Sequence, residues 1–76
     1  MEICRVRYIV VRNNRTEIFC GLARHYQFKP IDDIGDTAIK TYLSEKKAKS
    51  SFISSWFNAE NENYEILPVE EIIRTI

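Results

Sequence analysis

Residues 37–57 read TAIKTYLSEKKAKSSFISSWF, and this stretch decides the fold. Its first part, residues 38–43, has the composition of a short strand. Its second part predicts a helix over residues 45–57, with Ser44 as an N-cap whose hydroxyl accepts from the amides of the first turn. Apolar residues recur on one side of that helix at intervals of three and four: Ala48, Phe52, Ile53, Trp56 and Phe57. A strand followed directly by such a helix indicates a sheet with a helix packed on it.

A hairpin is predicted before this stretch. Residues 2–12 and 16–24 are rich in β-branched and aromatic residues, and they flank Asn13-Asn14-Arg15, a sequence suited to a tight turn. A two-residue loop would set Tyr8 opposite Phe19. A three-residue loop sets Val10 opposite Ile18, Tyr8 opposite Cys20 and Val6 opposite Leu22, which collects the apolar residues on one face. We adopt the three-residue loop.

The last predicted strand covers residues 64–69, YEILPV. We place it at an edge of the sheet because Pro68 cannot donate to a ladder. Residues 70–76 fit a helical turn and a frayed strand equally well. The order β-β-β-α-β predicts a single α+β domain over residues 1–76, a small antiparallel sheet with one helix packed on one face.

The face of this sheet away from the helix is expected to stay partly open. An exposed apolar face on a small domain usually marks an interface, either with a protein partner or between two copies in a homodimer. The helix end offers a second apolar surface, since Trp is frequent among interface anchors. The candidate interface residues are Ile3, Ile9, Val11, Phe19, Trp56 and Phe57.

Charge supports an alternative, nucleic-acid binding. The net charge at pH 7 is zero, which argues against strong affinity for phosphate, but residues 1–29 hold six Lys or Arg against two Glu. Basic and aromatic residues alternate on the predicted hairpin, as on sheets that stack single-stranded bases. The candidate contacts are Arg5, Arg7, Arg12, Arg15 and Arg24. The simpler interpretation is that these arginines pair with acidic residues on the surface.

Catalytic and metal-binding patterns are weak. Cys20 and His25 are the only conceivable nucleophile and base, and an odd spacing puts them on opposite faces of a strand. Asp32, Asp33 and Asp36 lack the spacing of a calcium loop and fit a solvated acidic turn. Glycine is too scarce for a phosphate-binding loop. We therefore predict a protein that is not an enzyme and needs no cofactor or metal.

Location follows from two further absences in the sequence. No apolar run approaches the length that spans a bilayer. The apolar residues near the N-terminus are interrupted by Arg5 and Arg7, which is unlike a signal peptide. A cytoplasmic protein with no membrane association is expected.

The pattern IKTYLSEKKAKSSF, followed by a polar spacer and YEILPVE, resembles small proteins of bacteriophages and mobile elements. Tyr42 corresponds to the aromatic residue of a strand that precedes their helix. The helix start of the Ser/Thr-x-Lys-Lys-Ala type matches Ser44, Lys46, Lys47 and Ala48, and the final strand matches Pro68, Val69 and Glu70. The resemblance covers about half of the chain. It implies a β-β-β-α-β domain of phage origin that binds a host protein, and it carries no catalytic residues.

Overall fold

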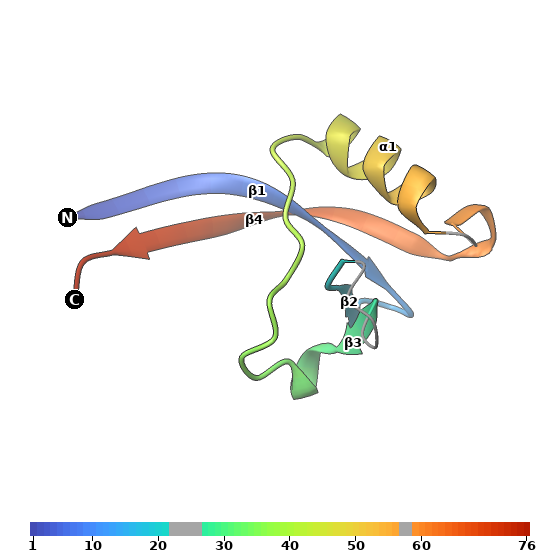
Figure 1. The fold of residues 1–76 in the computed structure, drawn as a ribbon, viewed down its shortest axis with the longest axis horizontal. Helices are drawn as coiled ribbons and strands as arrows, with labels where there is room; N and C mark the ends of the chain where they lie inside the picture. Colours follow the sequence, from blue (N-terminus) through green and yellow to red (C-terminus); the bar gives the residue numbers. More distant parts are fainter. Residues whose placement is uncertain (22–26, 57–58) are drawn as a thin grey trace.

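The computed structural model describes residues 1–21, 27–56 and 59–76. Its elements are β1 (Glu2–Arg12), β2 (Glu17–Phe19), β3 (Phe28–Pro30), the 3₁₀ turn η1 (Ile31–Asp33), α1 (Glu45–Ser55), the 3₁₀ turn η2 (Ala59–Asn61) and β4 (Tyr64–Arg74). The strands form one antiparallel sheet in the order β3-β2-β1-β4, and α1 packs on one face of it (Figure 1). The predicted α+β class, with one helix on an antiparallel sheet, is confirmed.

The third strand is not the predicted one. Residues 38–43 form no strand, since Lys40 donates its amide to the carbonyl of Phe19 at 3.3 Å and Tyr42 forms an isolated bridge with Tyr8 through two backbone hydrogen bonds of 2.9 Å. The third strand is β3 instead, and it pairs with β2. Phe28 of β3 packs its ring 5.2 Å from the ring of Phe19, so burial of an aromatic pair favours this short strand.

The hairpin between β1 and β2 has a longer loop than either predicted register. Val11 lies opposite Ile18 and Arg12 opposite Glu17, so four residues form the loop. Asn13, Asn14 and Arg15 all have positive φ, at 53°, 58° and 66°. Three consecutive left-handed residues are rare, and the sequence signals only the two asparagines. This one-residue difference moves every side chain of β2 to the other face.

The predicted helix is confirmed over most of its length. Ser44 caps it by accepting from the Lys47 amide at 3.1 Å. Ala48, Phe52 and Trp56 are buried, as the spacing predicts, whereas Ile53 is exposed. The helix ends at Ser55, and Phe57 lies outside the described residues.

The core has two parts, one on each face of the sheet. The part under the helix is mainly aromatic and contains Val10, Phe19, Tyr42, Ala48, Phe52, Trp56 and Ala59. The part on the opposite face contains Ile9, Val11 and Ile18, with Cys20, Ile34, Leu67 and Val69 packed against it. The expectation of an open second face is therefore wrong at this end of the sheet, because Ile34 of the loop after η1 packs against that face.

Strand β4 is longer than predicted and pairs with β1 from Tyr64 to Arg74. It is an edge strand, as Pro68 indicates. Pro68 lies opposite Tyr8, whose backbone groups point away from β4 toward Tyr42. In an antiparallel ladder such a pair is not hydrogen-bonded, so the nitrogen of Pro68 also points outward and the ladder loses no donor.

The helix offers a matched test of the core. Phe52 is fully buried and its ring lies 5.2 Å from Phe19, whereas the neighbouring Ile53 is 44% exposed. We expect Phe52→Ala to lower the free energy of unfolding by about 3–5 kcal/mol because it leaves a cavity among aromatic rings. Ile53→Ala should change it by less than about 1 kcal/mol. Urea titration followed by far-UV circular dichroism measures both values, and equal losses would contradict this assignment of the core.

Candidate functional site

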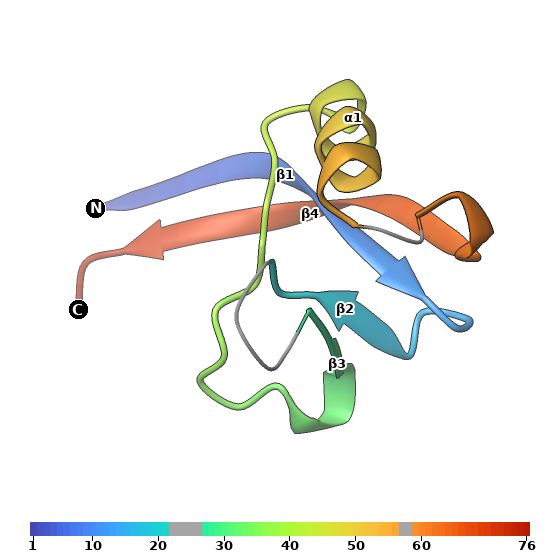
Figure 2. The same ribbon diagram turned by 45° about the vertical axis from the view of Figure 1, so that its right-hand side comes forward.

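The least covered part of the molecule is the outer half of the β1–β4 ladder, residues 2–6 paired with residues 70–74, which we call the arm. The arm extends away from the helix and from β2 and β3 as a two-stranded ribbon (Figures 1 and 2). Large apolar side chains on it are exposed: Ile3 by 41%, Val6 by 58%, Ile72 by 48% and Ile73 by 45%. Four such residues on a short ribbon are too many to be scattered surface residues, so the arm is the candidate site.

Both edges of the arm are unpaired. Because the backbone groups of Tyr8 point away from β4, those of alternate residues of β1 do so as well. The same alternation applies to β4, counting from Pro68. The outward residues are Glu2, Cys4 and Val6 on β1 and Glu70, Ile72 and Arg74 on β4. None of the described residues pairs with these backbone groups, so each edge can accept a further strand.

Both faces of the arm carry apolar side chains. Alternation along the strands puts Cys4, Val6 and Ile72 on the face that further along bears the helix. Ile3 and Ile73 are directly opposite each other on the other face. A strand added to either edge would therefore find apolar neighbours on both faces.

The charges of the arm are paired across its two strands, with one exception. Arg5 donates to Glu71, and Arg74 donates from Nε to Glu2 at 2.9 Å. Glu70 is exposed and has no ion-pair partner among the described residues. One carboxylate on an otherwise neutralised ribbon is thus available to another molecule.

The predicted interface residues are divided by the structure. Ile3 lies on the arm. Ile9, Val11, Phe19 and Trp56 are buried, with exposures of 9% or less, so they stabilise the fold and present little surface. Phe57 lies outside the described residues. Sequence reasoning missed Val6, Ile72 and Ile73, because residues 70–76 had no assigned structure and the open surface was sought only on the sheet face away from the helix.

The candidate nucleic-acid residues that the structure describes are engaged in ion pairs. Arg5 and Arg7 both approach Glu71, and Arg15 donates to Glu65 at 2.8 Å. Arg24 lies outside the described residues. The simpler interpretation, surface arginines paired with acidic residues, describes these contacts.

Arg12 differs from the other described arginines because it forms two ion pairs and also contacts an aromatic ring. Its guanidinium binds Glu17 at 2.9 Å and Glu62 at 3.1 Å, and it lies 4.0 Å from the centre of the Phe28 ring. These contacts connect β1, β2, β3 and the segment before β4. Arg12 thus packs against the edge of the aromatic core, where two carboxylates and an aromatic ring fix the position of its half-buried guanidinium.

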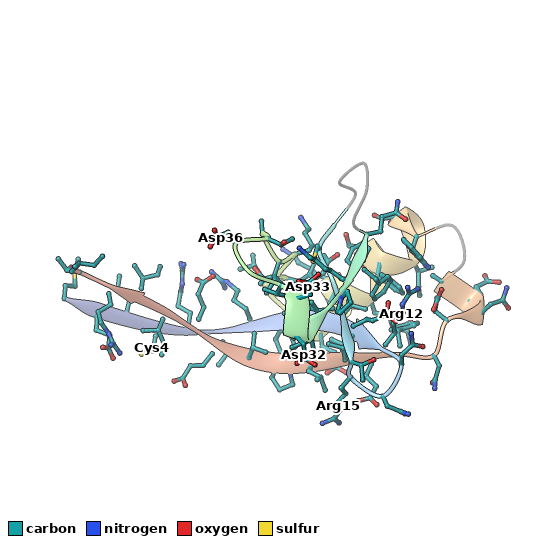
Figure 3. The ribbon with its side chains drawn as sticks, turned by 90° about the horizontal axis from the view of Figure 1, so that it is seen from below. Cys4, Arg12, Arg15, Asp32, Asp33 and Asp36 are labelled. Atoms are coloured by element: carbon teal, nitrogen blue, oxygen red, sulfur yellow. The ribbon has the colours of Figure 1, made fainter. Side chains whose placement is uncertain are left out.

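Of the two candidate catalytic groups, Cys20 lies within the described residues. Burial raises the pKa of the Cys20 thiol, with Lys29 opposing the shift, so the unreactive thiol form is favoured. His25 lies outside the described residues. Cys4 is exposed on the arm (Figure 3). Asp32 and Asp36 point to different sides of their loop in Figure 3. Within residues 1–21, 27–56 and 59–76, no group of three His, Cys, Asp or Glu could hold a metal.

Comparison with models of protein families, with curated proteins and with solved structures finds no match to this chain. In the described part of the chain, no helix has the length and apolar character needed to cross a membrane. The site is therefore interpreted from its own geometry.

The Arg12–Glu17 contact predicts a pH dependence. The hydrogen bond from Arg12 lowers the pKa of Glu17 below its ordinary 4.5, against a smaller opposing effect of burial. The stabilisation from this contact is therefore complete above pH 4.5 and is lost as the pH falls through the lowered pKa of Glu17 in the folded state.

We expect Glu17→Gln to be less stable than the natural chain by about 1 kcal/mol at pH 7. Urea titrations between pH 7 and pH 3 should show this difference shrinking below pH 4.5. A difference that stays constant would contradict the assignment, and the exposed Glu60→Gln is the control.

Proposed function

We propose that this protein is a non-enzymatic binding module that takes up a polypeptide partner through the arm. The observation that carries the proposal is the combination of exposed apolar side chains and unpaired backbone edges on residues 2–6 and 70–74. Natural proteins usually protect such edges, because a free edge with apolar side chains recruits another strand. Strand addition supplies affinity through the backbone and specificity through alternate side chains.

A protein partner suits the arm better than a nucleic acid does. The basic residues on and beside the arm already have carboxylate partners: Arg5 and Arg7 approach Glu71, and Arg74 binds Glu2. Net charge is zero over the whole chain. Because phosphate contacts dominate nucleic-acid affinity, a neutralised surface favours a polypeptide.

The resemblance to bacteriophage proteins adds a host protein as the kind of partner. That part of the proposal depends on the pattern around Ser44 and Pro68 alone, and it is independent of the arm. The arm itself is defined by burial and pairing.

The test is a selection of peptides by the immobilised protein from a random twelve-residue library. We expect enriched peptides with alternating apolar residues, because every second side chain of an added strand meets the same face. Their affinity, measured by fluorescence anisotropy, should fall at least about tenfold for Val6→Lys, which replaces the most exposed of the four large apolar residues of the arm with a charge.

Ile53→Lys is the matched control, because Ile53 is an apolar residue of similar exposure on α1, away from the arm. This variant should bind the selected peptides as the natural chain does. Both variants should keep the same unfolding midpoint, since both positions are exposed. No enrichment, or equal binding by Val6→Lys, would contradict the proposal.

A further inference from the structure

The outer edge of β4 has a limited stretch that another strand can use. Glu70, Ile72 and Arg74 direct their backbone N–H and C=O groups outward, and Pro68 precedes them with an outward nitrogen that carries no hydrogen. Proline on an edge stops pairing at its position. An added strand therefore finds its donors and acceptors on residues 70–74.

From the charges on this stretch we infer that it pairs, antiparallel, with the same stretch of a second copy, about a two-fold axis at Ile72. Glu70 of each copy then lies directly opposite Arg74 of the other, and the two Ile72 side chains meet at the axis. This inference rests on the proposed function of the arm and names the occupant of its β4 edge.

Charge selects this register over its neighbours. An axis at Glu70 or at Glu71 sets two carboxylates opposite each other, and an axis at Arg74 sets two guanidinium groups opposite each other. An axis at Ile73 sets Ile72 opposite Arg74 and leaves Glu70 without a partner. Only the axis at Ile72 forms two pairs of opposite charge.

In each copy, the side chains of Glu70 and Arg74 are able to form these additional ion pairs. Glu70 is the one charged residue of the arm without an ion-pair partner among the described residues. Arg74 uses Nε for Glu2, its side chain is 67% exposed, and its guanidinium has further N–H donors for a second carboxylate. The pairing would produce a row of alternating charge in the order Glu2, Arg74, Glu70 across the two copies.

The arrangement is also sterically open. The two strands run in opposite directions from Ile72, and β4 extends from there about 26 Å to Tyr64 at about 3.3 Å per residue. The helices of the two copies would therefore lie at opposite ends, because α1 packs near the far end of β4 (Figure 1). Three outward residues of each copy would exchange about six backbone hydrogen bonds.

The β1 edge offers no comparable match. Its charges, Glu2 and Arg5, lie on opposite faces of the strand, so no antiparallel self-pairing sets one opposite the other. A two-fold axis at Cys4 would set Glu2 of one copy opposite Val6 of the other, and Ile3 opposite Arg5. The second copy is thus assigned to β4, and the β1 edge stays available to a different polypeptide.

Charge reversal tests both the dimer and its register. In Glu70→Arg homodimers both cross-pairs would be basic, and in Arg74→Glu homodimers both would be acidic. We expect the natural chain to sediment as a dimer and each variant as a monomer, with dissociation constants raised at least about tenfold. An equimolar mixture of the two variants restores opposite charges at both pairs and should form a heterodimer.

The control is Glu60→Arg, which makes the same charge change on the exposed turn η2 and should dimerise like the natural chain. Repeating the series with Glu2→Gln in every chain removes the repulsion that Arg74→Glu creates inside its own arm. A monomeric natural chain at about 1 mM, dimers of both single variants, or a mixture that stays monomeric would each overturn the inference.

The outcome separates this inference from the proposed function. The charge variants leave Val6 and the β1 edge intact, so the selected peptides report on the arm independently of the dimer. A monomeric chain that still binds them in a Val6-dependent way would overturn the dimer alone. If the natural chain binds none of the peptides, the proposed function is overturned.

Discussion

The antiparallel ladder between β1 and β4 is the constraint on which the rest of the structure depends. It joins Glu2–Arg12 to Tyr64–Arg74 through eleven residue pairs, so the first and last strands of the chain are neighbours in the sheet. Closing so long a loop costs conformational entropy, and the burial of apolar side chains along the inner half of the ladder offsets that cost. Val10 and Val11, on opposite faces, are both almost fully buried there.

Coverage of this ladder changes along its length. At the inner end, α1 covers one face with Phe52 and Trp56, and the residues around Ile18 and Ile34 cover the other. At the outer end, the same two strands continue without a covering layer (Figure 2). Buried apolar surface is therefore concentrated at one end of the ladder and exposed apolar surface at the other.

The arm carries only part of the usual protection against strand addition. Pro68 blocks the middle of the β4 edge, and pairs such as Arg5–Glu71 place charge on the surface. Beyond Pro68 the edge is open among the described residues, and Glu70 and Arg74 lie on the same face on either side of Ile72. In the proposed pairing, this protected middle and open outer stretch would direct association to one place and one register.

The sequence by itself determined the elements whose signals are local. Ser44 and the spacing of Ala48, Phe52 and Trp56 predict the helix correctly, because a capping hydroxyl and a four-residue repeat act within a few turns. The strand-forming residues of β1 and the edge position of Pro68 were predicted for the same reason. The α+β class follows from these elements together.

Tertiary structure alone decided which segments pair and which surfaces remain uncovered. The hairpin register depends on a left-handed Arg15 that composition does not signal, and the third strand depends on the ring of Phe28 reaching Phe19. The arm exists because residues 70–74 pair with residues 2–6 from the far end of the chain. Pairing and coverage are long-range properties set by the total burial of the folded chain, so no local pattern contains them.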